Sequence, residues 1–167
     1  MFGIVDRIRA ATSVNLRSLH GEKILRVEYI HSDPNWPTNY RLDPDMHEPD
    51  AAVRLTTSAG EFILAWEMYG EDELLTFSTT REVEERQVRF PAHRSDVSMV
   101  DPWPALMKLS VIDASIVENV WSDATIRIHF GLVEVDMSLG EWDVSGCRYI
   151  PNALLIEFLG AGDPLRR

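Results

Sequence analysis

Cysteine and long apolar runs are scarce in this chain of 167 residues, and each shortage excludes a class of protein. The single cysteine, Cys147, excludes an internal disulfide and any CxxC metal site. No run approaches the ~18 consecutive apolar residues that a membrane-spanning helix requires. The N-terminus also has no basic segment leading into an apolar one. We therefore expect a cytoplasmic protein with no membrane partner.

Signatures of catalysis and of cofactor binding are missing as well. The chain contains no GxSxG, no P-loop and no GxGxxG, and its five histidines show no ligand spacing such as HExxH. The acidic stretch 43–50 departs from the calcium-loop pattern, because Pro44 and Met46 interrupt it and no glycine stands at the turn. We therefore predict no catalytic residue, no metal site and no cofactor, and a protein that is not an enzyme.

Basic residues are few: 16 Lys and Arg stand against 27 Asp and Glu, which gives a formal net charge of −11. Such a surface repels phosphate backbones and anionic lipids, so nucleic acid is not an expected partner. It favours encounter with a protein whose surface is basic. The alternative is that the acidity serves only to keep the protein in solution.

One stretch of the chain occurs twice. Residues 16–33 and 106–123 share six identities in 18 positions at a constant offset of 90, where average composition predicts about one. The strand patterns that follow, at 52–55 and 125–128, are offset by 73. The first copy therefore carries 90 − 73 = 17 additional residues, which we place at 34–50.

These offsets predict two pseudo-repeated β modules within a single domain spanning 1–167. The first covers about 16–80 with the inserted loop, the second covers about 106–159, and 81–105 connects them. Convergence of two amphipathic sheets on similar sequences is the alternative explanation.

Alternation of apolar and polar residues predicts mostly antiparallel strands. The strands are expected at 23–31, 53–57, 62–68, 73–79, 126–130, 133–139 and 153–159. Helical spacing predicts a short N-terminal helix over 2–11, followed by a polar break at 12–15. The sequence of 82–90 is compatible with a short charged helix and with an edge strand, and the residues 87–90 favour the strand. We expect a mostly β fold, a sandwich or a curved split sheet, with α+β as the alternative.

The insertion at 34–50 is the best candidate for a binding element. Its four prolines exclude a central strand and predict a long surface loop. Such loops are often functional, and aromatic anchors with a charged rim are typical of partner contacts. The acids at 71–73 could extend the same surface. The predicted partner-binding residues are Trp36, Tyr40, Asp43, Asp45, Glu48, Asp50, Glu71, Asp72 and Glu73. The alternative is that Trp36 folds back to cover a sheet edge.

Size, negative charge, a β-rich pattern and the lack of catalytic motifs together resemble the small acidic immunity proteins that bacteria encode beside secreted toxins. The resemblance implies one-to-one capture of a toxin, with acidic side chains meeting a basic active-site cleft. Charge complementarity would chiefly raise the association rate. Two other classes stay open: a structural or oligomer-forming β-protein, and a small-ligand or enzyme pocket between the two halves. A monomer and a homodimer are both compatible with the sequence.

Overall fold

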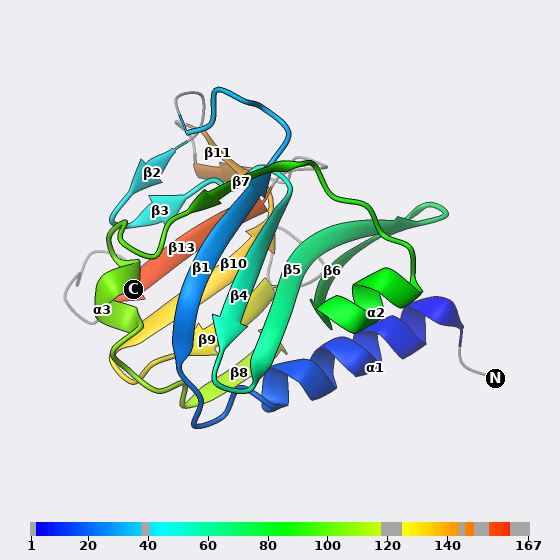
Figure 1. Cartoon of the computed structure of the whole chain (residues 1–167), viewed down its shortest axis with the longest axis horizontal. Helices are drawn as coiled ribbons and strands as arrows, with labels where there is room; N and C mark the ends of the chain where they lie inside the picture. Colours follow the sequence, from blue (N-terminus) through cyan, green and yellow to red (C-terminus); the bar gives the residue numbers. More distant parts are fainter. Residues whose placement is uncertain (1–2, 38–40, 118–124, 144–145, 149–153, 161–167) are drawn as a thin grey trace.

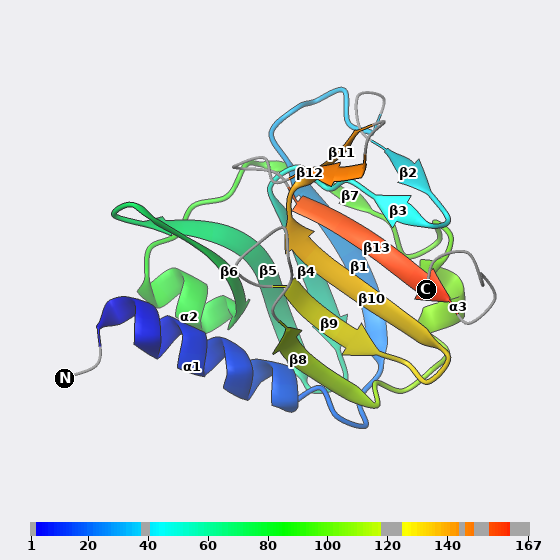
Figure 2. The same cartoon turned by 180° about the vertical axis from the view of Figure 1, so that it is seen from behind.

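The computed structural model describes residues 3–37, 41–117, 125–143, 146–148 and 154–160. Two antiparallel sheets pack face to face, and an N-terminal helix runs along one end of them (Figures 1 and 2). This arrangement confirms the predicted mostly β fold and identifies it as a sandwich.

The first sheet has the strand order β6-β5-β4-β1-β7. Its strands are β1 (Ile24–His31), β4 (Ala52–Thr57), β5 (Gly60–Tyr69), β6 (Asp72–Thr79) and β7 (His93–Asp96). The predicted hairpin formed by 53–57 and 62–68 is confirmed as β4 and β5, which pair from Thr57↔Gly60 to Ala52↔Ala65.

The second sheet has the order β2-β3-β13-β10-β9-β8. Its strands are β2 (Leu42–Asp43), β3 (Met46–His47), β8 (Asp113–Val117), β9 (Thr125–His129), β10 (Val133–Leu139) and β13 (Leu154–Gly160). A separate short hairpin is formed by β11 (Glu141–Asp143) and β12 (Gly146–Arg148).

Each sheet contains a meander of four antiparallel strands in chain order. In the first sheet these are β1, β4, β5 and β6, and in the second they are β8, β9, β10 and β13. A duplication would produce this shared order, although two sheets that arose separately could share it too. The internal duplication stays a prediction.

Both sheets contribute their inner faces to one apolar core. Val27 and Leu64 from the first sheet and Ile126 and Met137 from the second are completely or almost completely buried in it. The alternation predicted for β1 is shifted by a bulge between Ile24 and Arg26, which leaves Leu25 exposed rather than on the apolar face. A bulge of this kind rotates the residues on one side of it to the opposite face.

Helix α1 (Ile4–Arg17) extends beyond the predicted 2–11, through the expected polar break. Thr12 and Asn15 are accommodated because their side chains bond to the first sheet. Thr12 Oγ1 accepts a hydrogen bond from the Phe77 N–H at 3.2 Å, and Asn15 Nδ2 donates to the Phe77 carbonyl at 3.0 Å. Polar residues on this face therefore attach the helix to β6. None of the helices in the described ranges is long and apolar enough to cross a bilayer.

The insertion at 34–50 is not the surface loop that its prolines predict, as far as it is described. It leaves the first sheet after β1, and β2 and β3 add to the edge of the second sheet, where Ile156↔His47 and Glu157↔Met46 pair. Met46 and His47 are buried. The prolines lie outside these two short strands, so the ladder loses no donor to them. The insertion therefore bridges the two sheets.

A buried chain of hydrogen bonds holds this bridge. His47 Nε2 lies 2.9 Å from the Asp101 carbonyl, and its Nδ1 lies 2.6 Å from the Tyr29 hydroxyl. The carbonyl can only accept, so Nε2 carries the proton and Tyr29 donates to Nδ1. Trp103, at the start of α3 (Trp103–Leu106), donates its indole N–H to Tyr29 at 2.9 Å. The imidazole is thus neutral and fully satisfied, and burial lowers the pKa of His47 to about 4.

We predict that His47 makes stability depend on pH between its ordinary pKa and its pKa in the fold. The unfolded chain binds the proton more readily, so stability is complete above about pH 6.5 and is lost as the pH falls toward about 4. The loss should reach about 1.4 kcal/mol at pH 5.5 and about 3 kcal/mol at pH 4. Urea unfolding at several pH values measures it.

The variant His47→Gln should lack this part of the pH dependence, whereas His20→Gln, at an exposed histidine, should keep it. Carboxylates titrate alike in all three proteins, so the difference between their curves isolates His47. Parallel curves for wild type and His47→Gln between pH 7 and 5 would contradict the assignment.

Candidate functional site

A cavity lies where β5 extends beyond the end of β4. Strand β4 pairs with β5 only as far as Ala52↔Ala65, whereas β6 continues to Tyr69↔Asp72. Among the described residues, the segment 66–69 therefore has a strand neighbour on the β6 side alone. A cleft of about 550 Å³ opens beside this free edge. Its size is within the ordinary range of ligand pockets, about 300–1,000 Å³.

Three segments line the cleft. They are the end of β5 (66–69), the segment after α2 (86–91), and Ser32, Asp50 and Ala51 at the two ends of the insertion. Every lining residue lies between 32 and 91, so the cleft belongs to the first predicted repeat and the connector. It does not lie between the two halves, where the alternative hypothesis places a small-ligand or enzyme pocket.

Aromatic side chains give the cleft an apolar lining. Trp66, Tyr69 and Phe90 line it and are all half-buried. Phe90 and Val88 also pack on a second, smaller apolar cluster on the outer face of the first sheet, which contains Ile30, Ala52, Ile63, Ala65 and Val83. Trp66 packs against the main core instead, so the cleft borders both apolar clusters.

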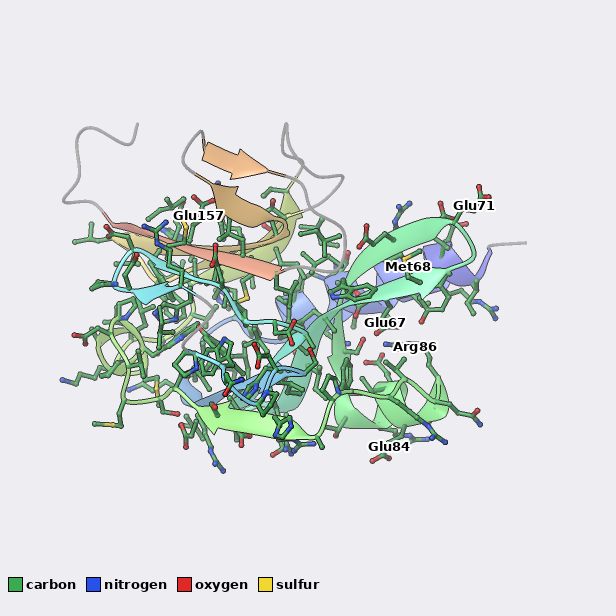
Figure 3. The ribbon with its side chains drawn as sticks, turned by 90° about the horizontal axis from the view of Figure 1, so that it is seen from above. Glu67, Met68, Glu71, Glu84, Arg86 and Glu157 are labelled. Carbon is green, nitrogen blue, oxygen red and sulfur yellow. The ribbon has the colours of Figure 1, made fainter. Side chains whose placement is uncertain are left out.

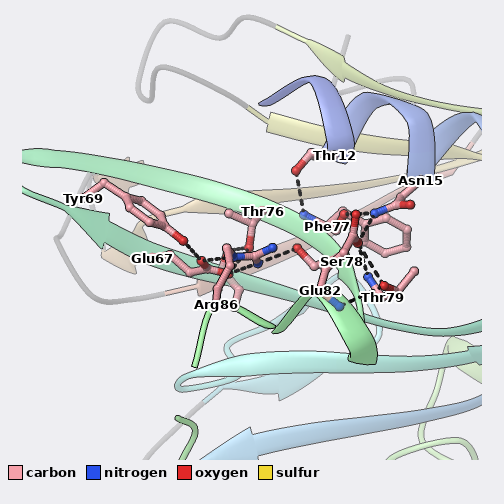
Figure 4. A network of polar contacts seen from close by, with 11 residues as sticks. Thr12, Asn15, Glu67, Tyr69, Thr76, Phe77, Ser78, Thr79, Glu82 and Arg86 are labelled. Atoms are coloured by element: carbon pink, nitrogen blue, oxygen red, sulfur yellow. Dashed lines mark hydrogen bonds and ion pairs between the residues drawn. The ribbon is translucent and has the colours of Figure 1, made fainter. Parts of the chain in front are cut away.

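A buried ion pair forms one wall. Glu67 on β5 and Arg86 after α2 approach to 2.7 Å, with side chains 4% and 17% exposed, and Figure 3 shows them facing each other between the β5–β6 hairpin and α2. Glu67 also accepts a hydrogen bond from Thr76 Oγ1 at 2.8 Å, and Arg86 donates to Ser78 Oγ at 2.8 Å (Figure 4). Burial alone would lower the pKa of Arg86, but the bond to Glu67 raises it.

Tyr69 completes the network by donating its hydroxyl proton to Glu67. Burial, and then the hydrogen bond to this carboxylate, raise the pKa of Tyr69 to about 12. The phenol is therefore protonated at neutral pH. It can donate a hydrogen bond, but it does not supply a phenolate.

Helix α2 (Thr80–Glu85) positions Arg86, and both of its ends are capped. Thr79 and Glu82 form a capping box at the start, a signature that the sequence carries as Thr-x-x-Glu. At the end, Gln87 has a φ of 57° and its N–H bonds to the Glu84 carbonyl, while the Val88 N–H bonds to Val83. These contacts define a Schellman motif. They also explain why 87–90 forms no strand, contrary to the favoured prediction.

The same network reaches the N-terminal helix. Glu82 accepts hydrogen bonds from the Thr79 N–H at 2.7 Å and from Asn15 Nδ2 at 2.7 Å (Figure 4). Helix α1 and helix α2 are thereby attached to the same end of β6, and the wall that carries Arg86 is fixed from two sides.

The predicted anchor Trp36 is not accessible. Its side chain is 7% exposed and lies in the main core, edge-on to Tyr29 and stacked on His31 with ring centroids 5.0 Å apart. The indole N–H donates to the Glu48 carbonyl at 3.2 Å. The structure thus corrects this prediction, because burial of the indole stabilises the insertion. The alternative, in which Trp36 folds back, describes its position better.

The other predicted residues do not form one surface. Asp43 and Asp45 lie at the β2–β3 turn, and Glu48 follows β3. The turn between β5 and β6 that carries the acids at 71–73 lies at the opposite end of the sandwich (Figure 1). Tyr40 lies outside the described residues.

Of the eight predicted residues that the structure describes, Asp50 alone lines the cleft. Its Oδ2 accepts a hydrogen bond from the Ser32 N–H at 2.5 Å and another from the Ser32 hydroxyl, which closes the base of the insertion. No group of three or more His, Cys, Asp or Glu side chains in the described chain is placed to hold a metal ion.

The residues that sequence reasoning missed are Glu67, Tyr69, Arg86 and Phe90. One signal was available: Glu67 interrupts a strand whose two faces are both apolar, and a carboxylate in that position requires a buried partner. The identity of the partner, Arg86, follows only from the course of the chain through α2.

Comparison with protein-family models, with curated proteins and with solved structures finds no match to this chain. The candidate site is therefore interpreted from its own geometry.

We predict that Arg86→Met destabilises the fold by about 3–5 kcal/mol, because it leaves the Glu67 charge buried without its partner. The double variant Glu67→Met/Arg86→Met should recover most of that loss, since it removes both charges. Urea unfolding at pH 7 measures both. Arg81→Met, which breaks the fully exposed Arg81–Glu85 pair, is the matched control and should change stability little. A double variant less stable than Arg86→Met would contradict the interpretation.

A second prediction concerns the left-handed residue that ends α2. Gln87→Gly should raise the free energy of unfolding by about 0.5–1 kcal/mol, because glycine adopts a positive φ without the steric cost of a side chain. Arg89→Gly, two residues further on, should not stabilise the protein. Thermal unfolding compares the two, and a loss of stability in Gln87→Gly would count against the cap.

Proposed function

We propose that this protein is a non-enzymatic binding protein that captures a basic protein partner at the cleft beside β5. The observation that carries the proposal is an open cleft with half-buried aromatics, set in a surface dominated by acids. The cleft is lined by Trp66, Tyr69 and Phe90, and the chain carries a net charge of −11. Aromatic contacts surrounded by charge are the usual composition of a protein-binding site.

The acids near the cleft supply the charge complementarity. Glu71 and Asp72 are exposed at the end of the β5–β6 hairpin, and Glu84 is exposed on α2 across from it (Figure 3). A negative field of this kind accelerates the approach of a basic protein and weakens with salt. The aromatic lining would then contribute mainly to slow dissociation.

The chemistry of the cleft favours binding over catalysis. Glu67 is held by Arg86, Thr76 and Tyr69, and Tyr69 keeps its proton at neutral pH. These groups stabilise one another and hold the walls in place. A general base or nucleophile needs a free lone pair directed at a substrate, and these side chains direct theirs at each other.

For the biological role we propose neutralisation of a toxin, as an immunity-type protein. What supports this role is the combination of a small acidic chain with an open cleft beside the end of β5, which suits one-to-one capture of a basic enzyme. The oligomer-forming alternative is less favoured because the exposed acids repel a second copy.

The proposal predicts a complex with a basic protein encoded by a neighbouring gene. The basic protein should arrest growth when it is expressed alone, and co-expression of the chain described here should relieve that arrest. The purified pair should bind one to one. Glu71→Lys should lower the association rate at low salt by about tenfold without changing stability. Stopped-flow measurements across a salt series test both effects.

Asp113→Lys is the matched control, because Asp113 is equally exposed but lies on β8 in the second sheet. It changes the net charge by the same amount and should affect the rate much less. An equal effect of the two variants on the association rate would contradict binding of the partner at the cleft. The absence of binding to every neighbouring gene product would overturn the immunity role.

A further inference from the structure

We infer that an extended, basic segment of the partner binds in the cleft as an additional β-strand paired with residues 66–69 of β5. For the charge of the partner, this inference rests on the proposed function. For the mode of binding, it rests on the strand pairing of the first sheet alone.

The backbone of β5 directs hydrogen-bonding groups toward the cleft. Only Gly70 and Glu71 connect β5 to β6, and the pairing runs without a shift from Tyr69↔Asp72 onward. Successive residues of a strand turn their N–H and C=O groups to opposite sides. Because the turn has only two residues, the backbone N–H and C=O groups of Tyr69 point toward β6. Those of residue 67 point toward β6 as well. The backbone N–H and C=O groups of Trp66 and Met68 therefore point to the other side, where β4 has already ended.

The β4–β5 hairpin gives the same alternation independently. Its closing pair, Thr57↔Gly60, turns the even-numbered residues of β5 toward β4. The chain before β4 does not continue along β5, because the Ala51 N–H donates to the Ile30 carbonyl of β1 at 2.9 Å. No strand of the described chain occupies the place beside 66–69.

The position beside this edge is hollow rather than filled by side chains. Ser32, Asp50 and Ala51 line the same cleft as residues 66–69, so the cleft occupies the line along which β4 would have continued. An open strand edge is a template for pairing with another chain, and several peptide-binding domains bind their ligands in this way. The segment 66–69 that lacks a neighbour on this side has four residues, which span roughly 14 Å of extended chain.

The side chains around the edge indicate which segment fits. An added strand would direct alternate side chains to the two faces of the sheet. On one face they would meet Tyr69 and the apolar residues Val88 and Phe90, and on the other they would meet Met68, which is 52% exposed. A segment with small β-branched residues at successive positions, such as alternating valine and threonine, places a suitable side chain on each face.

The charges indicate where the basic residues of the segment lie. Within the cleft, Glu67 is neutralised by Arg86, and Asp50 and Arg89 carry opposite charges. The excess negative charge is at the hairpin end, at Glu71 and Asp72. Lysine or arginine should therefore lie beside that end. A second copy of this chain would bring another net charge of −11 to the same edge, so a basic partner is the favoured occupant.

The first test uses two synthetic peptides and the wild-type protein. An acetylated Lys-Lys-Val-Thr-Val-Thr should bind at least about tenfold more tightly at low salt than Glu-Glu-Val-Thr-Val-Thr. With the basic peptide bound, amide hydrogen exchange should slow about tenfold at Trp66 and Met68, whose N–H groups face the cleft. The amide at 67, already in the β5–β6 ladder, should change little. Protection elsewhere, or equal binding of both peptides, would overturn the inference.

The second test removes the donor. Met68→Pro deletes a backbone N–H that faces the cleft and spares the hydrogen bonds between β5 and β6. It should therefore lower the affinity for the basic peptide by at least about tenfold. Met68→Ala removes the same side chain but keeps the N–H, and should bind within about threefold of wild type. Circular dichroism checks both folds, and if Met68→Pro does not fold, the exchange measurement on wild type decides. Equal binding by the two variants would refute strand addition.

Two further outcomes separate this inference from the proposed function. If a neighbouring-gene partner binds wild type and Met68→Pro equally, capture stands and strand addition is wrong. If the unliganded protein self-associates in sedimentation, and Met68→Pro abolishes this association, the edge belongs to a second copy and the inference is overturned. Peptide pairing at 66–69 without any neighbouring-gene partner would support the inference and remove the immunity role.

Discussion

Neither sheet of this protein can bury its inner face alone, and the mutual burial of the two faces is the constraint on which the other features depend. Leu64 and Ile126 lie in one core although they belong to different sheets. Two stacked sheets have edge strands whose outer backbone N–H and C=O groups are unpaired unless another segment covers them. Strand β3 covers the β13 edge of the second sheet, whereas β5 of the first sheet keeps an uncovered end.

The polar groups buried in the sandwich lie where elements from different parts of the chain meet. His47 joins the insertion to Tyr29 of β1 and to the loop before α3, and Glu67 joins β5 to the residue after α2. In both places an unpaired polar group would be costly in a low-dielectric interior, so each group requires its partner. These contacts specify which segments dock together, while the apolar core supplies most of the stabilisation.

The sequence predicted regular strands well and non-local features poorly. The alternation at 133–139 identified β10, because apolar and polar residues follow one another with period two, and the apolar run at 62–66 identified β5 as a strand covered on both faces. The insertion was interpreted as a loop because of its four prolines. Strands β2 and β3 leave no pattern in the sequence, since they have two residues each and β3 pairs with a strand more than 100 residues away. The cleft could not be predicted, since it depends on where β4 stops relative to β5. The start of α2 was predictable from its capping box.

The crossing of the insertion between the sheets has a consequence for how the protein is made. Strand β3 pairs with Ile156 and Glu157, near the end of the described chain. During synthesis the first sheet can form long before this partner leaves the ribosome, and until then Met46 and His47 have no ladder to join. A nascent chain stopped short of β13 would leave the β2–β3 segment without its strand neighbour, and side chains such as Met46 without their cover, and exposed apolar groups of this kind are targets for chaperones and proteases. Pairing with β13, the last strand of the described chain, therefore completes the cover over this part of the insertion.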